Sequence, residues 1–162
     1  MTHVIDIAQP PVDSVPVTHL CDISVELQPA QVISTAAGLR LTFVITAGEV
    51  TGPALRGELL PGGGDWLQVG SDGVGHVDVR ATIRTHDGAL IHFTSGGVIR
   101  IPPDGFQRLR VGRPLPFTET YVRTTPAFET ADDRYRGLAQ VVAVGYNVLS
   151  PDHVDYRVYQ LL

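Results

Sequence analysis

The segment "HVDVRATIRTHDGALIHFTSGGVIR", residues 76–100, alternates apolar and polar side chains on both sides of the turn signal Asp87-Gly88. A two-residue loop at that signal would pair side chains of opposite character. A loop that starts one residue earlier pairs Ile83 with Ile91 and places Gly88 where a left-handed residue is needed. The segment therefore predicts an antiparallel hairpin with a three-residue loop.

The two faces of this hairpin differ sharply, and the polar face allows two interpretations. Its members are Asp78, Arg80, Thr82, Arg84, His92 and Thr94. Antiparallel sheets usually expose one polar face to solvent. Alternatively, the polar face lines the lumen of a barrel whose apolar face packs under other elements, since eight strands enclose just enough space for side chains or one small ligand.

The same period-two alternation recurs along most of the chain. It is clear in "THLCDISVEL", residues 18–27, and in "LRLTFVITA", residues 39–47. Further predicted strands are 54–60, 66–69, 74–85, 89–101, 117–124, 136–148 and 154–161. A turn of helix is predicted only near residues 132–138. Many short strands separated by Gly, Pro and Asp predict a single all-β domain, a barrel or a sandwich, over 17–162, after an N-terminal arm, 1–16.

The composition excludes several classes of function. All 12 residues of the Lys+Arg count are Arg, so there is no Schiff-base lysine, phosphate-loop lysine or lysine general base. A net charge of -5 without Arg–aromatic clusters predicts no nucleic-acid partner. No stretch approaches the roughly 20 apolar residues of a membrane span, so no membrane partner is expected. One cysteine, Cys21, and no signal peptide predict a cytoplasmic location.

The glycine-rich stretch "PGGGDW", residues 61–66, lacks the pattern of a nucleotide-binding loop. The residues after it look extended, so we interpret the glycines as a turn or bulge linking two strands. None of the six histidines has the spacing of a metal site, and no serine lies in a nucleophile motif. The sequence thus predicts no metal and no cofactor.

The remaining candidates for chemistry are an acid, an arginine and aromatic side chains. Asp65 follows the glycines and precedes Trp66, the only tryptophan, which either anchors the core or rim or stacks on a ligand. Arg80 lies in mid-strand and needs exposure or an acidic partner, for which the candidates are Asp65, Asp78 and Glu129. Such a pair is either structural or able to polarise a carbonyl while a nearby acid moves a proton. Tyr121 is either a hydrogen-bond donor to substrate or a residue of the barrel wall.

Four stretches together resemble a bacterial and fungal family known as domain-of-unknown-function family 3237. These are "GPALRGELLPGGGDWLQV", "VDVRATIRTHDGALI", "YVRTTPAFETADDRYRGL" and the terminal "VYQLL". The resemblance runs from about Gly52 to the C-terminus. It implies a calycin-like antiparallel β-barrel, similar in outline to lipocalins and allene-oxide-cyclase-type barrels, but no agreed activity. Implied signature positions are Gly64-Asp65-Trp66, Arg80, Thr85, Asp87-Gly88 and Phe128-Glu129.

We therefore expect a single, roughly eight-stranded antiparallel barrel with little helix, acting as a cofactor-independent cyclase or isomerase. Its substrate would be a small, largely apolar carbonyl compound held in the lumen, and the expected setting is natural-product biosynthesis. The predicted catalytic residues are Asp65, Arg80 and Tyr121. The predicted substrate-binding residues are Trp66, Thr82, His92, Thr94 and Phe128.

Two further hypotheses stay open at this point. One is a lipocalin-like carrier that binds a small molecule without chemistry. The other is a barrel filled by its own side chains, which would hold no cavity above roughly 300 Å³. Edge strands and Pro-rich segments are consistent with a homodimer.

Overall fold

The computed structural model describes residues 13–162; the rest of the predicted N-terminal arm, residues 1–12, lies outside the described residues. The described chain forms ten strands, one short α-helix and two 3-10 helices. The strands are β1 (Val17–Leu27), β2 (Gln31–Thr35), β3 (Gly38–Thr51), β4 (Gly57–Leu59), β5 (Gly64–Gly70), β6 (Gly75–Thr85), β7 (Leu90–Arg100), β8 (Tyr121–Glu129), β9 (Ala143–Leu149) and β10 (His153–Leu161). The helices are α1 (Gly105–Arg110), η1 (Phe117–Glu119) and η2 (Arg136–Gln140).

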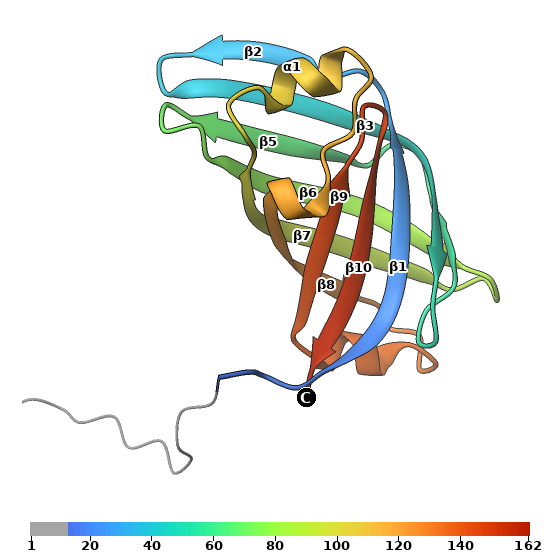
Figure 1. Cartoon of the computed structure of the whole chain (residues 1–162). Helices are drawn as coiled ribbons and strands as arrows, with labels where there is room; N and C mark the ends of the chain where they lie inside the picture. Colours follow the sequence, from blue (N-terminus) through green and yellow to red (C-terminus); the bar gives the residue numbers. More distant parts are fainter. Residues whose placement is uncertain (1–12) are drawn as a thin grey trace, which may run out of the picture.

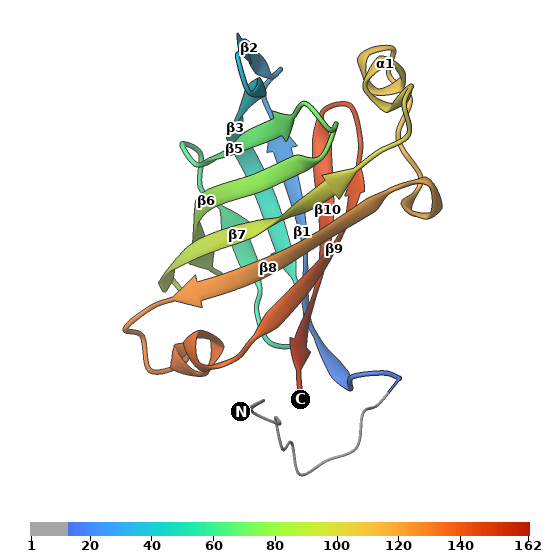
Figure 2. The same cartoon turned by 90° about the vertical axis from the view of Figure 1, so that its left-hand side faces the viewer.

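The strands close into an antiparallel barrel (Figures 1 and 2). The ring runs β1–β10–β9–β8–β7–β6, passes through β4 and β5 to β3, and closes because β3 also pairs with β1. Counting β4 and β5 as one position gives eight positions, while β2 extends the sheet beyond the ring as a partner of β3. This confirms the predicted eight-stranded all-β barrel.

The triple glycine forms a bulge within one position of the ring. β4 and β5 each pair antiparallel to β3 on one side and to β6 on the other, so the chain keeps its direction between them. At the break the Ile45 N–H donates to the Gly63 carbonyl at 2.9 Å, and Gly62 has a φ of +103°. The turn-or-bulge interpretation is confirmed in its bulge form.

The β6–β7 hairpin has the predicted register. Ile83 lies opposite Ile91 and Ala81 opposite Phe93, and the left-handed loop residue is Gly88, with a φ of +90°. All four of the paired apolar residues are buried, so the apolar face is the inside of the barrel. The polar face points to solvent, and the interpretation of that face as a lumen lining is wrong, because burying the apolar face removes more apolar surface from water.

Several boundaries differ from the sequence-based expectation. β2 and α1 were not predicted, and the strand expected over 136–148 begins only at Ala143, after η2. The strand expected over 117–124 consists of η1 followed by β8, which runs on to Glu129. Over residues 13–162 no helix combines the length and apolar character needed to cross a bilayer.

Candidate functional site

The inside of the barrel is apolar except for a few polar side chains. Strand alternation points them inward from five different strands. They are Asp65 on β5, Ser95 on β7, Thr124 on β8, Asn147 on β9 and Tyr156 on β10. Asp65 is half-buried and the other four are buried. Thr85, the last residue of β6, is a further buried polar residue, and its hydroxyl is hydrogen-bonded to Asp87 and Ala89 of the hairpin loop.

An interior cavity of about 30 Å³ adjoins Asp65. Its walls are Val25, Leu27, Ile45, Leu59, Asp65, Val79, Phe93, Val154 and Tyr156. This space suffices for about one water molecule. The interior is therefore filled largely by the protein's own side chains in this conformation, as the self-filled barrel hypothesis expects. Leu27 and Val154 are only half-buried, so they form the more accessible part of the wall.

The Asp65 carboxylate fills a gap in the β5–β6 ladder. The strands pair at Asp65↔Val79 and again only at Gln68↔His76. Within this gap the Asp78 N–H donates to Asp65 Oδ1 at 3.0 Å. Unpaired backbone groups are costly when buried, so the carboxylate satisfies a donor that the ladder leaves free.

Burial raises the pKa of Asp65 to about 6. The hydrogen bond from the Asp78 N–H lowers it, and the negative charge of Asp78 raises it further. A carboxyl group with a pKa near neutrality can both accept and return a proton at physiological pH. Asp65 therefore has the protonation behaviour of a general acid–base group.

Tyr156 lines the same cavity from β10, on the opposite wall. Its pKa is raised by burial and, secondarily, by the charge of Asp65. The phenol consequently keeps its proton over the whole physiological range and is a permanent hydrogen-bond donor. Its place in the alternation Val154, Tyr156, Val158 was a signal for an inward side chain that our sequence reasoning missed.

The other interior polar groups differ in how far they are satisfied. The Thr124 hydroxyl donates to Asn147 Oδ1 at 3.2 Å. Ser95 Oγ is buried without a hydrogen-bond partner among the described residues. Sequence reasoning did not single out these groups as interior ones.

The predicted residues Arg80, Thr82, His92 and Thr94 lie on the outer face of the barrel. Arg80 is 60% exposed and pairs with Asp78 at 3.3 Å, whereas Asp65 faces the interior. The Arg80–Asp65 pair that the sequence suggested does not form, because residues 65 and 80 lie on opposite sides of the barrel wall.

Trp66, Arg80, Thr82 and His92 are nevertheless brought together on the outside. With residues 60–63 they line a surface hollow of about 300 Å³. The Arg80 guanidinium lies 5.7 Å from the centre of the Trp66 ring, a cation–π contact. Trp66 is thus an exposed surface residue, separated from the interior cavity by its own strand.

Tyr121 and Phe128 are not among the residues that line the cavity beside Asp65. Tyr121 is 43% exposed and lies beneath the guanidinium groups of Arg100 and Arg123. Phe128 is buried and packs against Phe93 with ring centres 5.5 Å apart, so it belongs to the core.

Two of the signature positions implied by the resemblance have a structural explanation. Asp87 Oδ1 accepts hydrogen bonds from the Thr85 hydroxyl at 2.6 Å and the Tyr135 hydroxyl at 2.8 Å. These bonds fasten the β6–β7 loop to the segment between β8 and β9. Within residues 13–162 no group of three or more His, Cys, Asp or Glu side chains is placed to hold a metal ion.

Fold and site together define a small antiparallel β-barrel whose largely apolar interior holds an ionisable acid and a few neutral polar side chains. The chain belongs to the family described as "Protein of unknown function (DUF3237)", whose model matches residues 15–161. A UPF0311 protein of Bradyrhizobium diazoefficiens is 31% identical over 79% of this chain and 84% of its own length.

Two solved structures extend the comparison to three dimensions. A β-barrel-like protein of Acinetobacter baumannii is 31% identical with a TM-score of 0.79, over 96% of this chain and 100% of its own. A protein described as an enzyme from Penicillium herquei is 20% identical with a TM-score of 0.69, over 96% of this chain and all of its own. At that identity the second likeness shows the fold alone.

Proposed function

We propose that this barrel is a cofactor-independent enzyme that isomerises or cyclises small, largely apolar carbonyl compounds by proton transfer in its interior. One observation carries the proposal: Asp65, with a pKa raised to about 6, faces a cavity whose other walls are apolar apart from Tyr156. Strongly shifted pKa values of this kind gather at functional sites. Natural-product biosynthesis is a setting that suits such substrates.

The two interior groups have complementary roles in this proposal. The Asp65 carboxylate removes a proton from the carbon next to the carbonyl group. The Tyr156 hydroxyl donates a hydrogen bond to the oxygen on which negative charge develops. Protonated Asp65 then returns its proton at another carbon, which completes an isomerisation. For ring closure, the carbanion instead attacks a second carbonyl carbon of the substrate, the C=O π bond breaks, and protonated Asp65 gives its proton to the alkoxide that forms. General acid–base catalysis contributes roughly 10²–10⁴-fold to such rates.

Tyr156 takes the donor role that the sequence suggested for Arg80 and Tyr121. Both of those side chains are exposed on the outer surface. A donor stabilises an oxyanion best in a site that excludes water, because electrostatic interactions are stronger there.

Substrate entry requires side chains to move, because the cavity of about 30 Å³ holds no organic molecule. The half-buried Leu27 and Val154 are the wall residues whose displacement costs least buried surface. This entry route predicts that Leu27→Trp blocks access of the substrate to the cavity and abolishes turnover, while Asp65 keeps its raised pKa.

The filled interior supports a second candidate, a purely structural barrel. In that case Asp65 only accepts the Asp78 N–H that the ladder leaves free. Asn can accept the same hydrogen bond, so Asp65→Asn would leave a structural barrel folded. The variant therefore separates catalysis from structure.

Solvent-proton exchange tests the proposal without knowledge of the natural substrate. Short β,γ-unsaturated ketones are incubated with the protein in D₂O, and NMR follows deuterium uptake next to the carbonyl and migration of the double bond. Exchange is expected with wild type and with Glu129→Gln, whose carboxylate is exposed on the outside. Loss of exchange is expected for Asp65→Asn and a partial loss for Tyr156→Phe.

Equal exchange by wild type and Asp65→Asn contradicts the assignment of the base. Saturable binding of the ketones without exchange, by a folded wild type, favours a carrier. Neither binding nor exchange favours the structural barrel.

A further inference from the structure

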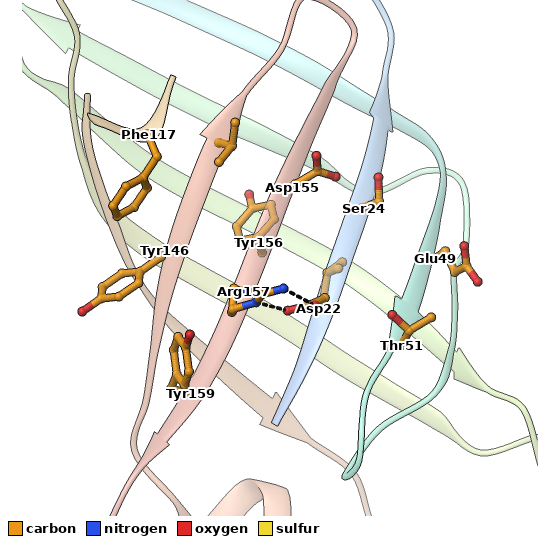
Figure 3. A pocket seen from close by; sticks show the side chains of 12 residues that line it. Asp22, Ser24, Glu49, Thr51, Phe117, Tyr146, Asp155, Tyr156, Arg157 and Tyr159 are labelled. Carbon is orange, nitrogen blue, oxygen red and sulfur yellow. Dashed lines mark hydrogen bonds and ion pairs between the residues drawn. The ribbon is translucent and has the colours of Figure 1, made fainter. Parts of the chain in front are cut away.

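A groove of about 580 Å³ crosses the outer surface of the barrel, separate from the interior cavity (Figure 3). Its floor is the outward face of β3, β1, β10 and β9, and Phe117 of η1 forms one side. The volume lies in the range of small-molecule sites, about 300–1,000 Å³. Tyr156 is the one residue that lines both this groove and the interior cavity, whereas Asp65 lines the cavity alone.

One side of the groove is aromatic. The Phe117 and Tyr146 ring centres lie 5.8 Å apart, and those of Tyr146 and Tyr159 lie 5.7 Å apart. Tyr146 and Phe117 are each about two-fifths exposed. The three rings form a continuous wall against which the apolar body of a ligand can pack.

The single arginine of the groove is already neutralised. Arg157 Nε and Nη2 donate to the two carboxylate oxygens of Asp22, each at 2.9 Å. This pairing lowers the pKa of Asp22 and leaves the guanidinium with no uncompensated charge to offer an anion. Arg157 therefore does not make the groove an anion site.

Two other carboxylates of the groove have no arginine partner among the described residues. Asp155 on β10 and Glu49 on β3 lie on either side of Ser24 on β1, since Ser24 is paired with both in the two ladders. Adjacent strands are about 4.8 Å apart, so the two acidic residues lie about 10 Å apart along the floor. Figure 3 shows these three side chains on the same side of the sheet. Near neutral pH they give the groove an excess of negative charge.

We propose that this groove binds a small organic cation, an amine with an apolar or aromatic body. The ammonium group lies over Ser24 between Asp155 and Glu49, and the body packs against Tyr146 and Tyr159. The inference is independent of the proposed catalysis, because the groove and the interior lie on opposite sides of the sheet.

The protein itself shows that this aromatic wall accepts a cation. The Arg123 guanidinium lies 4.5–4.8 Å from the ring centres of Phe117 and Tyr146, which belong to the wall, and of the neighbouring Tyr121. Arg123 is not among the residues that line the groove. Ring faces attract cations and repel anions, so the same wall disfavours a carboxylate ligand.

Titration with a matched set of probes tests this inference. Phenethylammonium is the cation, 3-phenylpropionate is the anion of similar shape, and 3-phenylpropanol is the neutral compound. Binding is followed by calorimetry and by NMR shifts at low salt and about pH 9, because a hydrogen bond to Asp152 and the charge of Asp155, 3.5 Å away, raise the pKa of His153 above its usual value. Saturable binding is expected for phenethylammonium alone, and it should weaken as salt is added.

The double variant Glu49→Gln/Asp155→Asn should weaken amine binding on the order of tenfold, because it removes two solvent-exposed ion pairs to the ammonium group. Glu129→Gln, which removes an exposed carboxylate elsewhere, should leave it unchanged. Asp65→Asn should also leave it unchanged, which separates this site from the interior one. No amine binding, equal binding of the anion, or full affinity in the double variant overturns the inference.

Discussion

Asp65 holds a proton more tightly in the folded chain than in the unfolded one, because its pKa is about 6 against 3.8 for a solvated aspartate. Between these two pH values the folded state is protonated at Asp65 and the unfolded state is not. The free energy of unfolding therefore falls as pH rises through this window, by on the order of 3 kcal/mol. Above about pH 6 Asp65 is ionised in both the folded and the unfolded state, so it no longer makes the free energy of unfolding change with pH.

Asp65→Asn removes this dependence, since an amide does not titrate. Relative to wild type, the variant should gain about 1–3 kcal/mol of unfolding free energy between pH 4 and about 6.5, measured by urea denaturation. Asp132→Asn is the opposite control, because Arg134 lowers the pKa of Asp132 to about 2. That variant should lose stability relative to wild type as pH rises from about 2 to about 4, and the difference should then stay constant up to about pH 6.5. A pH-independent difference for Asp65→Asn would contradict the raised pKa.

The sequence identified Asp65 as a candidate site residue, but it did not show whether its side chain faces the interior or the outside of the barrel. That side depends on how many residues the bulge at residues 60–63 inserts before β5, and Gly-rich segments leave this number open. The expected partner Arg80 was therefore placed on the wrong side of the wall. Tyr156 has the apolar neighbours of a core residue, but its relation to Asp65 arises only when the ring closes between β1 and β3.

Among the elements, the β6–β7 hairpin was predictable because its two faces differ so much in polarity that only one register buries the apolar one. β2 carries no such signal, since all of its residues are exposed. α1 buries only Gly105 along its six residues, so it lacks an apolar stripe that a helical period would reveal. Strands and helices that bury few side chains therefore show little apolar periodicity in the sequence.

The loop of this hairpin depends on a left-handed residue. Gly88 has a φ of +90°, and a Cβ there would meet no atom within 4 Å, so the cost of Gly88→Ala is backbone strain alone. We expect a loss of about 1–2 kcal/mol in thermal or urea unfolding. Gly137→Ala is the matched control, with equally open surroundings and no positive φ, and it should change stability little. Equal effects of the two substitutions would argue against strain at Gly88.

At the scale of the whole molecule, the two ends of the barrel segment lie side by side. β1 begins where β10 ends: Val17 is paired with Leu161, and the Leu162 N–H donates to the Pro16 carbonyl at 3.0 Å (Figure 2). The first and last strands of the barrel are therefore hydrogen-bonded neighbours, and the two ends of the barrel segment lie next to each other. The closing strand contact is between β1 and β3, which no local sequence pattern specifies.

A circular permutant should therefore fold if the new ends lie in an exposed turn. Joining Leu162 to Met1 and opening the chain between Asp72 and Gly73, both exposed between β5 and β6, preserves every strand. We expect the same far-UV circular dichroism and an unfolding free energy within about 2 kcal/mol of wild type. Opening the chain instead between Val79 and Arg80 cuts β6, which is paired on both edges, and should abolish folding. If both permutants fold equally well, then the stability of the barrel does not depend on an intact β6. The pairing of β5 with β6 would then hold the position of Asp65 less firmly than the hydrogen-bond register indicates.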